Sequence, residues 1–251
     1  MAINHISFFS DQLQMMTSMN VILPDHPNGQ GDVLLLLHGL GDDEHAWIAQ
    51  TNLVDYAKKT QTTIIMPRAE RSYYTNAMNG KKYGDFVGEE VLQRCQKWFH
   101  LPDDRARTFI AGNSMGGFGA LKFGLGYSET FSKLFVLSAM PDIKASWQAN
   151  PDRDAWFQSL FGSPDQVTNS TNDIGYLIAQ QQNNAPEIWQ FCGREDPFFA
   201  MNDRLAQQIE IKRLRHTFVT VPGGHEWRLW DQAIDRILKM IATHERHNVI
   251  L

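Results

Sequence analysis

A serine lies among small residues at the point where a predicted strand meets a predicted helix. Residues 112–116 read Gly-Asn-Ser-Met-Gly, which matches the G-x-S-x-G pattern of a nucleophile elbow centred on Ser114. Glycine inside a helix costs about 0.5–1 kcal/mol relative to alanine, so local stability does not explain the glycines around this serine. Small residues two positions before and after the serine permit a tight, strained turn that projects the hydroxyl group. We therefore predict that Ser114 is a nucleophile.

The same glycine-rich turn could instead hold a phosphate group at the amino terminus of a helix. The chain contains no G-x-x-x-x-G-K-[ST] pattern, and no G-x-G-x-x-G pattern follows the first strand that is predicted to be parallel. The placement between a strand and a helix is the one that a nucleophile elbow requires. These observations favour nucleophilic catalysis over phosphate binding.

A serine hydroxyl group needs a base that is itself oriented by a carboxylate. His225, in VPGGHEW, lies between the last predicted strand and the last predicted helix, where the histidine falls in the chain order serine, acid, histidine. The acid is predicted from FCGREDPFF, which follows the next-to-last strand. Asp196 is favoured there, and its neighbour Glu195 is the alternative. Asp173 and Asp203 are fallback candidates.

Backbone N–H groups can stabilise the negative charge of a tetrahedral intermediate by about 2.7–4 kcal/mol per donor. Met115 follows the nucleophile at the start of a helix, so its N–H group is the first predicted donor. The second is predicted from HGLG at 38–41, just after the first parallel strand, and is assigned to Leu40. We expect His38 to shape this loop rather than to take part in the chemistry.

Two histidines and three acids between residues 38 and 45 could bind a divalent ion by chance. They are His38, Asp42, Asp43, Glu44 and His45. A solvated acidic segment at the start of a helix, favoured by the positive end of the helix dipole, explains the three carboxylates better. No metal and no cofactor is predicted.

The elements that would position these residues alternate along the chain. Residues from Ile3 to Pro24 have a β-like pattern that predicts an antiparallel pair at a sheet edge. The apolar run VLLLL at 33–37 is typical of a strand covered on both faces, hence of a parallel sheet with helices on each side. Repeated strand–helix order predicts a doubly wound, mostly parallel sheet. Further strands are expected at 62–67, 107–112, 133–139, 187–193 and 216–223, with helices at 44–60, 83–100, from 114, 202–214 and 228–244.

Residues 141–186 interrupt this alternation with a segment rich in Pro, Asn, Asp and Ser that also carries several aromatic residues. Its apolar content is too small for a separate core. We therefore expect a single domain over 1–251, in which 141–186 forms short helices over the end of the sheet, near the active site.

Composition excludes several other classes of protein. The chain has 251 residues, a net charge of −5, 43% hydrophobic and 20% charged residues, as in an ordinary globular protein. Lys and Arg are scattered, which disfavours nucleic-acid binding. Cys95 and Cys192 lie in a helical and a strand pattern and are expected to be buried. The first residues lack the pattern of a signal peptide and no apolar run could span a membrane, so a cytoplasmic location is expected, while homo-oligomerisation stays open.

With these motifs in place, the chain resembles the esterase D branch of the α/β-hydrolases, and within it the tributyrin esterase group. The resemblance rests on LLLLHGLGDDEHAW, IIMPRAERSYYT, RTFIAGNSMGGFGALKFGL, FCGRED and GGHEW, and it covers nearly the whole chain. GNSMGGFGALK is its most specific part. It implies an α/β-hydrolase fold and hydrolysis of short-acyl carboxylic esters through an acyl-enzyme, with no cofactor and a small-molecule ester as the partner.

The resemblance also assigns roles to residues of this sequence. It implies a nucleophile, an acid, a base, two oxyanion donors and three aromatic residues at the border of an acyl pocket. The implied nucleophile is Ser114, the acid is Asp196 and the base is His225. The implied oxyanion donors are Leu40 and Met115, and the aromatic residues are Tyr73, Tyr74 and Trp147. Core packing is the alternative for each of the three aromatic residues.

Two alternatives use the same triad. An acyltransferase would exclude water and pass the acyl group to an alcohol or thiol. S-formylglutathione hydrolases share this branch, but their oxyanion loop usually contains a cysteine, whereas the loop here reads GLGDDEHAW. A binding module without activity is disfavoured because a complete set of triad residues is present.

Overall fold

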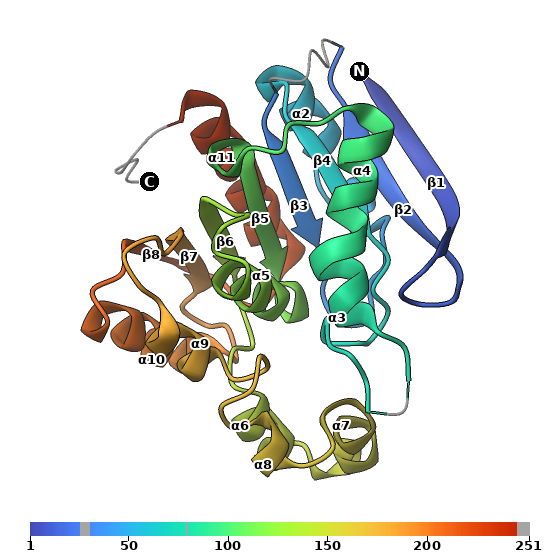
Figure 1. The fold of residues 1–251 in the computed structure, drawn as a ribbon. Coiled ribbons are helices and arrows are strands. Elements are labelled where there is room, and N and C mark those ends of the chain that lie inside the picture. The colour runs from blue at the N-terminus through green and yellow to red at the C-terminus, as the bar shows by residue number, and fades with distance from the viewer. Residues whose placement is uncertain (26–30, 79, 245–251) are drawn as a thin grey trace.

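The computed structural model describes residues 1–25, 31–78 and 80–244. These residues contain one eight-stranded sheet with the strand order β1-β2-β4-β3-β5-β6-β7-β8 (Figure 1). β1 pairs with β2 and β2 with β4 in antiparallel fashion, whereas the pairs from β4 to β8 are parallel. The predicted mostly parallel sheet and the antiparallel pair at its edge are confirmed. The strands are β1 (Ala2–Ser10), β2 (Met15–Leu23), β3 (Val33–Leu37), β4 (Thr63–Pro67), β5 (Thr108–Asn113), β6 (Lys133–Leu137), β7 (Glu187–Gly193) and β8 (His216–Val221).

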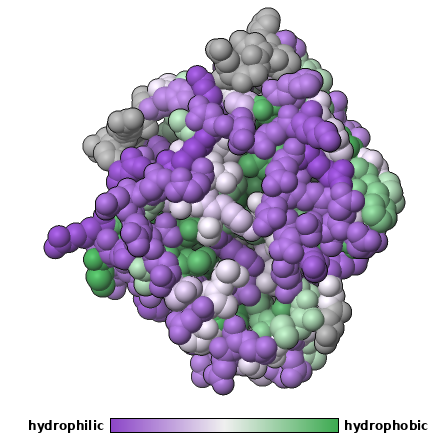
Figure 2. Space-filling view, in the orientation of Figure 1, coloured by the Kyte–Doolittle hydropathy of each residue, from purple (hydrophilic) through white to green (hydrophobic). Residues whose placement is uncertain are grey.

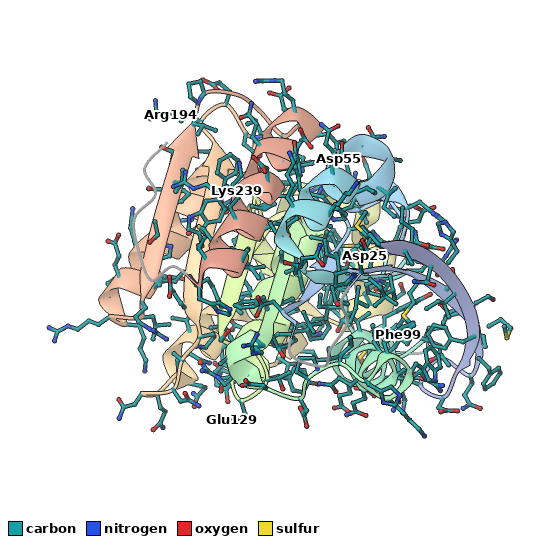
Figure 3. All side chains as sticks on the ribbon, turned by 90° about the horizontal axis from the view of Figure 1, so that it is seen from above. Asp25, Asp55, Phe99, Glu129, Arg194 and Lys239 are labelled. Carbon is teal, nitrogen blue, oxygen red and sulfur yellow. The ribbon has the colours of Figure 1, made fainter. Side chains whose placement is uncertain are left out.

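Helices cover both faces of this sheet. Seen from above, Asp55 of α2 and Lys239 of α11 lie on one side of the sheet, and Phe99 of α4 lies on the other with Glu129, which follows α5 (Figure 3). The α-helices are α1 (Ala46–Gln50), α2 (Leu53–Thr60), α3 (Tyr83–Asp85), α4 (Val91–Phe99), α5 (Met115–Gly126), α6 (Ile143–Ala149), α7 (Asp154–Phe161), α8 (Pro164–Val167), α9 (Ile174–Gln180), α10 (Phe199–Ile211) and α11 (Trp227–Thr243). A π-helical turn spans Phe86–Glu90, and 3₁₀ turns span Arg105–Arg107 and Pro151–Arg153.

The continuous apolar run of β3 is explained by these two helical layers. Successive side chains of a strand point to opposite faces of the sheet. Leu34 and Leu36 belong to the core that the sheet shares with α2 and α11. Leu35 and Leu37 belong to the core on the opposite face, which contains residues of α4 and α5. Each face therefore needs an apolar residue at every second position, and the strand needs one at every position.

Two of the predicted helices are interrupted. The helix expected at 44–60 is divided into α1 and α2 at Thr51, whose backbone is extended with φ −136° and ψ 170°. The Thr51 hydroxyl group donates to the Trp47 carbonyl group, and the Asn52 N–H group donates to Asp231 Oδ1 of α11 at 2.8 Å. These polar contacts compete with the helical hydrogen bonds and allow the chain to turn. The helix expected at 83–100 contains the π-helical turn between α3 and α4.

The segment 141–186 forms short helices, α6 to α9, and Figure 1 shows α6, α7 and α8 beyond the end of the sheet to which β3 and β5 point. It does not have a core separate from the main one. Its buried aromatic residues Trp147, Phe157 and Phe161 belong to the same hydrophobic cluster as β3, β5 and α5. Its helices therefore extend the core of the sheet domain.

Most of the face shown in Figure 2 is hydrophilic, and hydrophobic residues reach the surface at the edge where Figure 1 places β1 and β2. Ile3 and Phe9 of β1 and Met16 of β2 are among the large exposed apolar side chains. In the part of the chain that the structure describes, no helix combines the length and the apolar character needed to cross a membrane.

Candidate active site

Ser114 occupies a strained turn between β5 and α5. Its backbone has φ 55° and ψ −116°, a conformation that residues other than glycine rarely adopt. The Ser114 N–H group donates to the carbonyl group of Leu137 in β6 at 2.9 Å. A Cβ atom on Gly112 would collide with the Gly116 carbonyl group, and one on Gly116 with the carbonyl group of Leu37 in β3. The glycines of the elbow therefore allow β5, α5 and β3 to approach one another closely.

His225 pairs with Asp196. His225 Nδ1 lies 2.8 Å from Asp196 Oδ2, and because a carboxylate only accepts, the imidazole N–H group is the donor. Asp196 Oδ1 accepts the Phe198 N–H group at 2.8 Å, so both oxygens of this buried carboxylate are used. Burial acts to raise the pKa of Asp196, but the hydrogen bonds from His225 and Phe198 outweigh it and lower that pKa below its usual value. The ionised form of Asp196 is thereby favoured beside His225.

Two aromatic rings hold the imidazole in place. Phe198 and Trp230 lie edge-to-face with His225, with ring centroids 5.2 and 4.8 Å away. Trp230 Nε1 donates to Ser138 Oγ at 3.2 Å, and the Ser138 hydroxyl group is another contributor to the lowered pKa of Asp196. Ser138 and Trp230 were not predicted from the sequence. The only local signal was the position of Trp230 in the helix that follows the histidine.

The remaining candidate acids have other partners. The Glu195 N–H group donates to the Gly223 carbonyl group at 3.1 Å, and the Glu195 carboxylate accepts the Gly223 N–H group. Glu195 thus joins the loop of Asp196 to the loop of His225 without pairing with the imidazole. Asp173 accepts the N–H group of Tyr176 and caps α9. Asp203 is exposed on α10 and accepts from a neighbouring side chain of that helix.

The predicted oxyanion loop follows β3, and its conformation depends on His38. His38 Nδ1 donates to the Gly39 carbonyl group at 2.8 Å, and Nε2 accepts the N–H group of Ala69 at 3.0 Å. Burial lowers the pKa of His38, which favours the neutral imidazole that these two hydrogen bonds require. Both ring nitrogens are therefore used for shaping the loop.

The two predicted oxyanion donors come from neighbouring strand ends. β3 and β5 are paired, with Leu37 opposite Gly112, so the residues that follow each strand lie at the same edge of the sheet. Among the described residues, the N–H groups of Leu40 and Met115 donate to no protein acceptor. An N–H group without an acceptor in the protein can donate to a bound molecule, so these two are available to a substrate oxygen.

A family model described as "Putative esterase" matches residues 10–241. The chain belongs to this esterase family. An acetyl esterase of Caldicellulosiruptor saccharolyticus is 31% identical, over 93% of this chain and 96% of the relative. The solved Staphylococcus aureus fluorophosphonate-binding serine hydrolase FphF has a TM-score of 0.87 and 29% identity, covering 96% of this chain and 98% of its own. The S-formylglutathione hydrolase FrmB from the same organism has a TM-score of 0.83 and 28% identity, covering 96% of this chain and 100% of the FrmB chain.

These comparisons and the sheet topology confirm the predicted α/β-hydrolase fold and a hydrolase that acts on esters. The esterase buries all three aromatic residues that were expected near the acyl pocket. Tyr73 packs against rings of α5 and α7, and the Trp147 indole donates to Asp154 at 2.7 Å. The Tyr74 hydroxyl group donates to the His38 carbonyl group at 2.8 Å. All three have structural partners, and their contact with an acyl group stays a prediction.

The prediction of a solvated acidic segment before α1 is wrong for Glu44. In the esterase this side chain is only 4% exposed, and it accepts the hydroxyl group of Ser18 at 2.5 Å. Arg68 lies 3.7 Å from its other oxygen. His45 Nδ1 lies 2.9 Å from the side-chain nitrogen of Asn20, whereas His38 Nδ1 donates to the Gly39 carbonyl group. The two histidines therefore do not share a site. The described residues hold no group of three or more His, Cys, Asp or Glu side chains suited to a metal ion.

Proposed function

We propose that the protein is a serine carboxylesterase that hydrolyses short-acyl esters through an acyl-enzyme. Ser114 is the nucleophile, His225 the base and Asp196 the acid of the triad. The observation that carries this proposal is the His225–Asp196 hydrogen bond of 2.8 Å, combined with the positive φ of Ser114 at the end of β5. The two features are independent, because one orients a base and the other exposes a hydroxyl group.

The hydrogen bond to Asp196 fixes the tautomer of the base. His225 donates through Nδ1, so Nε2 carries the free lone pair that takes the proton of Ser114 as the hydroxyl group attacks the ester carbonyl carbon. The carbonyl oxygen becomes an oxyanion, for which the N–H groups of Leu40 and Met115 are the proposed donors. Nε2 then returns the proton to the alcohol that leaves. A water molecule, activated by the same imidazole, releases the acid from the acyl-enzyme.

The short-acyl preference and the place in the tributyrin esterase group are supported by the motifs of the sequence and by the 31% identical acetyl esterase. The alternative is a thioesterase of the S-formylglutathione type, which the similarity to FrmB favours. The segment 39–47 contains no cysteine. Cys95 and Cys192 are both buried, and burial raises the pKa of each thiol to about 12. A carboxylic ester is therefore the better candidate substrate.

The test is the hydrolysis of p-nitrophenyl acetate, butyrate and octanoate, with S-formylglutathione as the competing substrate. We expect activity to decline beyond butyrate, and Ser114→Ala to lower kcat by about 10⁴–10⁶-fold. Ser132→Ala is the matched control, because the Ser132 hydroxyl group lies at the opposite end of the sheet, next to the Thr108 carbonyl group. A fluorophosphonate should label Ser114 in the wild type and in the control variant. Retained activity in Ser114→Ala would contradict the assignment, and faster turnover of S-formylglutathione would favour the thioesterase.

A further inference from the structure

A lysine is buried in the helix that starts at the nucleophile. Lys122 of α5 is 7% exposed, and its ammonium group donates to the Tyr74 carbonyl group at 2.9 Å and to Asn172 Oδ1 at 2.7 Å. Thr75 donates to the same Asn172 oxygen at 3.0 Å. Burial lowers the pKa of Lys122 to about 7. Because burying an ammonium group is unfavourable, its retention here requires a reason other than packing.

The partner of this lysine is a strained segment. Tyr73 and Tyr74 both have left-handed backbones, with φ 49° and 53°. Such conformations cost free energy and persist only where the surroundings enforce them. The Tyr74 N–H group donates to Ser72 Oγ at 3.0 Å, and its carbonyl group accepts from Lys122. The backbone of Tyr74 is therefore held on both sides.

The ring of Tyr74 is held by the same helix. A Cβ atom on Gly119 would lie 2.7 Å from Tyr74 Cδ2, so only glycine leaves room for the ring at this position. Gly119 and Lys122 are three residues apart on α5 and hence on one face of the helix. One residue makes space for the ring and the other binds the carbonyl group. α5 thus holds both the backbone and the ring of Tyr74.

The far end of the Tyr74 side chain reaches the oxyanion loop. Its hydroxyl group donates to the His38 carbonyl group at 2.8 Å, and the ring of His38 is itself bonded to Gly39 and Ala69. Leu40, the proposed oxyanion donor, is two residues further along the chain. A continuous series of hydrogen bonds therefore runs from Asn172, between α8 and α9, through Lys122 and Tyr74 to this loop.

We propose that Lys122 and Tyr74 are positioning residues that set the oxyanion loop and couple it to the segment 141–186. The proposal rests on the proposed function in that Leu40 is taken as an oxyanion donor. A displacement of about 1 Å at such a donor can lower the rate about 10²-fold. Because the oxyanion exists in the transition state and not in the bound ester, the effect falls on kcat and not on KM.

Tyr74→Phe is the sharpest test, because it removes only the hydroxyl group and keeps the ring on Gly119. Tyr127→Phe is the matched control, since the Tyr127 hydroxyl group donates to exposed Glu89 beyond the other end of α5. We expect Tyr74→Phe to lower kcat for p-nitrophenyl butyrate by about 10–100-fold with KM changed less than about twofold. Hydrogen exchange of residues 38–41 should become faster. The control should match the wild type in both measurements.

Lys122→Met tests the coupling to the segment 141–186, with Lys144→Met as its control because Lys144 is exposed and bonds Thr168. We expect faster exchange in both 38–41 and 170–174 for Lys122→Met alone. If Lys122→Met does not fold, Tyr74→Phe decides the proposal. Unchanged kcat and unchanged exchange at 38–41 in folded Tyr74→Phe would overturn it. If the wild type hydrolyses no ester but exchange responds as expected, the coupling stands and the proposed function fails.

Discussion

Asp196→Asn is the variant for which the structure makes the most demanding prediction. The carboxylate accepts from the Phe198 N–H group at one oxygen and from His225 Nδ1 at the other, at 2.8 Å each. An asparagine offers one oxygen and one NH₂ group. When the oxygen stays on the Phe198 N–H group, the NH₂ group faces Nδ1, and the imidazole must move its proton to Nε2. That is the atom which has to accept the proton of Ser114, so kcat should fall by about 10⁴-fold. This loss corresponds to about 5 kcal/mol of transition-state stabilisation.

The assay is steady-state hydrolysis of p-nitrophenyl butyrate at pH 8, together with the ¹⁵N NMR signals of the histidine, which report its tautomer. Glu195→Gln is the control, because a glutamine oxygen can still accept the Gly223 N–H group that Glu195 now accepts. We expect its kcat to stay within about threefold of the wild-type value, since no charge next to the imidazole is lost. The proposed role of Asp196 is refuted if Asp196→Asn keeps a tenth of the wild-type kcat, or if Glu195→Gln loses as much activity as Asp196→Asn.

Three further predictions concern stability, measured as the free energy of unfolding in urea. Gly124→Ala places a methyl group inside the Leu134 side chain and should lower the free energy of unfolding by about 1–3 kcal/mol. In Gly126→Ala nothing lies within 4 Å of the added methyl group, so the free energy of unfolding should stay unchanged or rise by up to about 1 kcal/mol. Equal effects of the two substitutions would contradict this prediction. Burial lowers the pKa of His216 from 6.5 to about 4, so the unfolded chain binds more protons in this range and stability should fall by about 1–2 kcal/mol between pH 7 and pH 5. In His216→Gln the free energy of unfolding should depend less on pH than in the wild type. An equally steep dependence on pH would exclude His216 as the cause. Glu90→Ala should cost about 3 kcal/mol, because Glu90 accepts from Ser10 and from two N–H groups of the β1–β2 turn, and exposed Glu89→Ala should cost less than about 0.5 kcal/mol.

The parts of the fold that the sequence predicted have local causes. The strand at 187–193 matches β7 at both ends, because Pro186 precedes it and Gly193 ends it. The elbow at Ser114 was readable because its glycines, its strand and its helix are contiguous. The pairing of His225 with the acid of FCGRED followed from chain order, and the structure places Asp196 there rather than Glu195. Each of these inferences depends on residues that are neighbours in the sequence.

The parts that sequence analysis missed depend on contacts between distant segments. Lys122 bonds residues that are 48 and 50 positions away, and nothing near it in the sequence identifies either partner. Glu44 lies among acidic residues, and its burial follows from Ser18, which is 26 positions earlier in β2. Trp230 and Ser138 are separated by 92 positions. A single sequence carries no record of such pairs.

The glycines of α5 can now be explained by what surrounds the helix. Local propensity alone would make this helix a poor one, since each internal glycine costs about 0.5–1 kcal/mol. Its residues from Met115 to Leu125 are buried, however, so tertiary packing rather than propensity determines its stability. Gly116 brings the helix start against β3, and Gly119 admits the ring of Tyr74, whose hydroxyl group donates to the His38 carbonyl group. The same substitutions that would improve the helix in isolation would therefore displace Ser114 or the loop at residues 38–41.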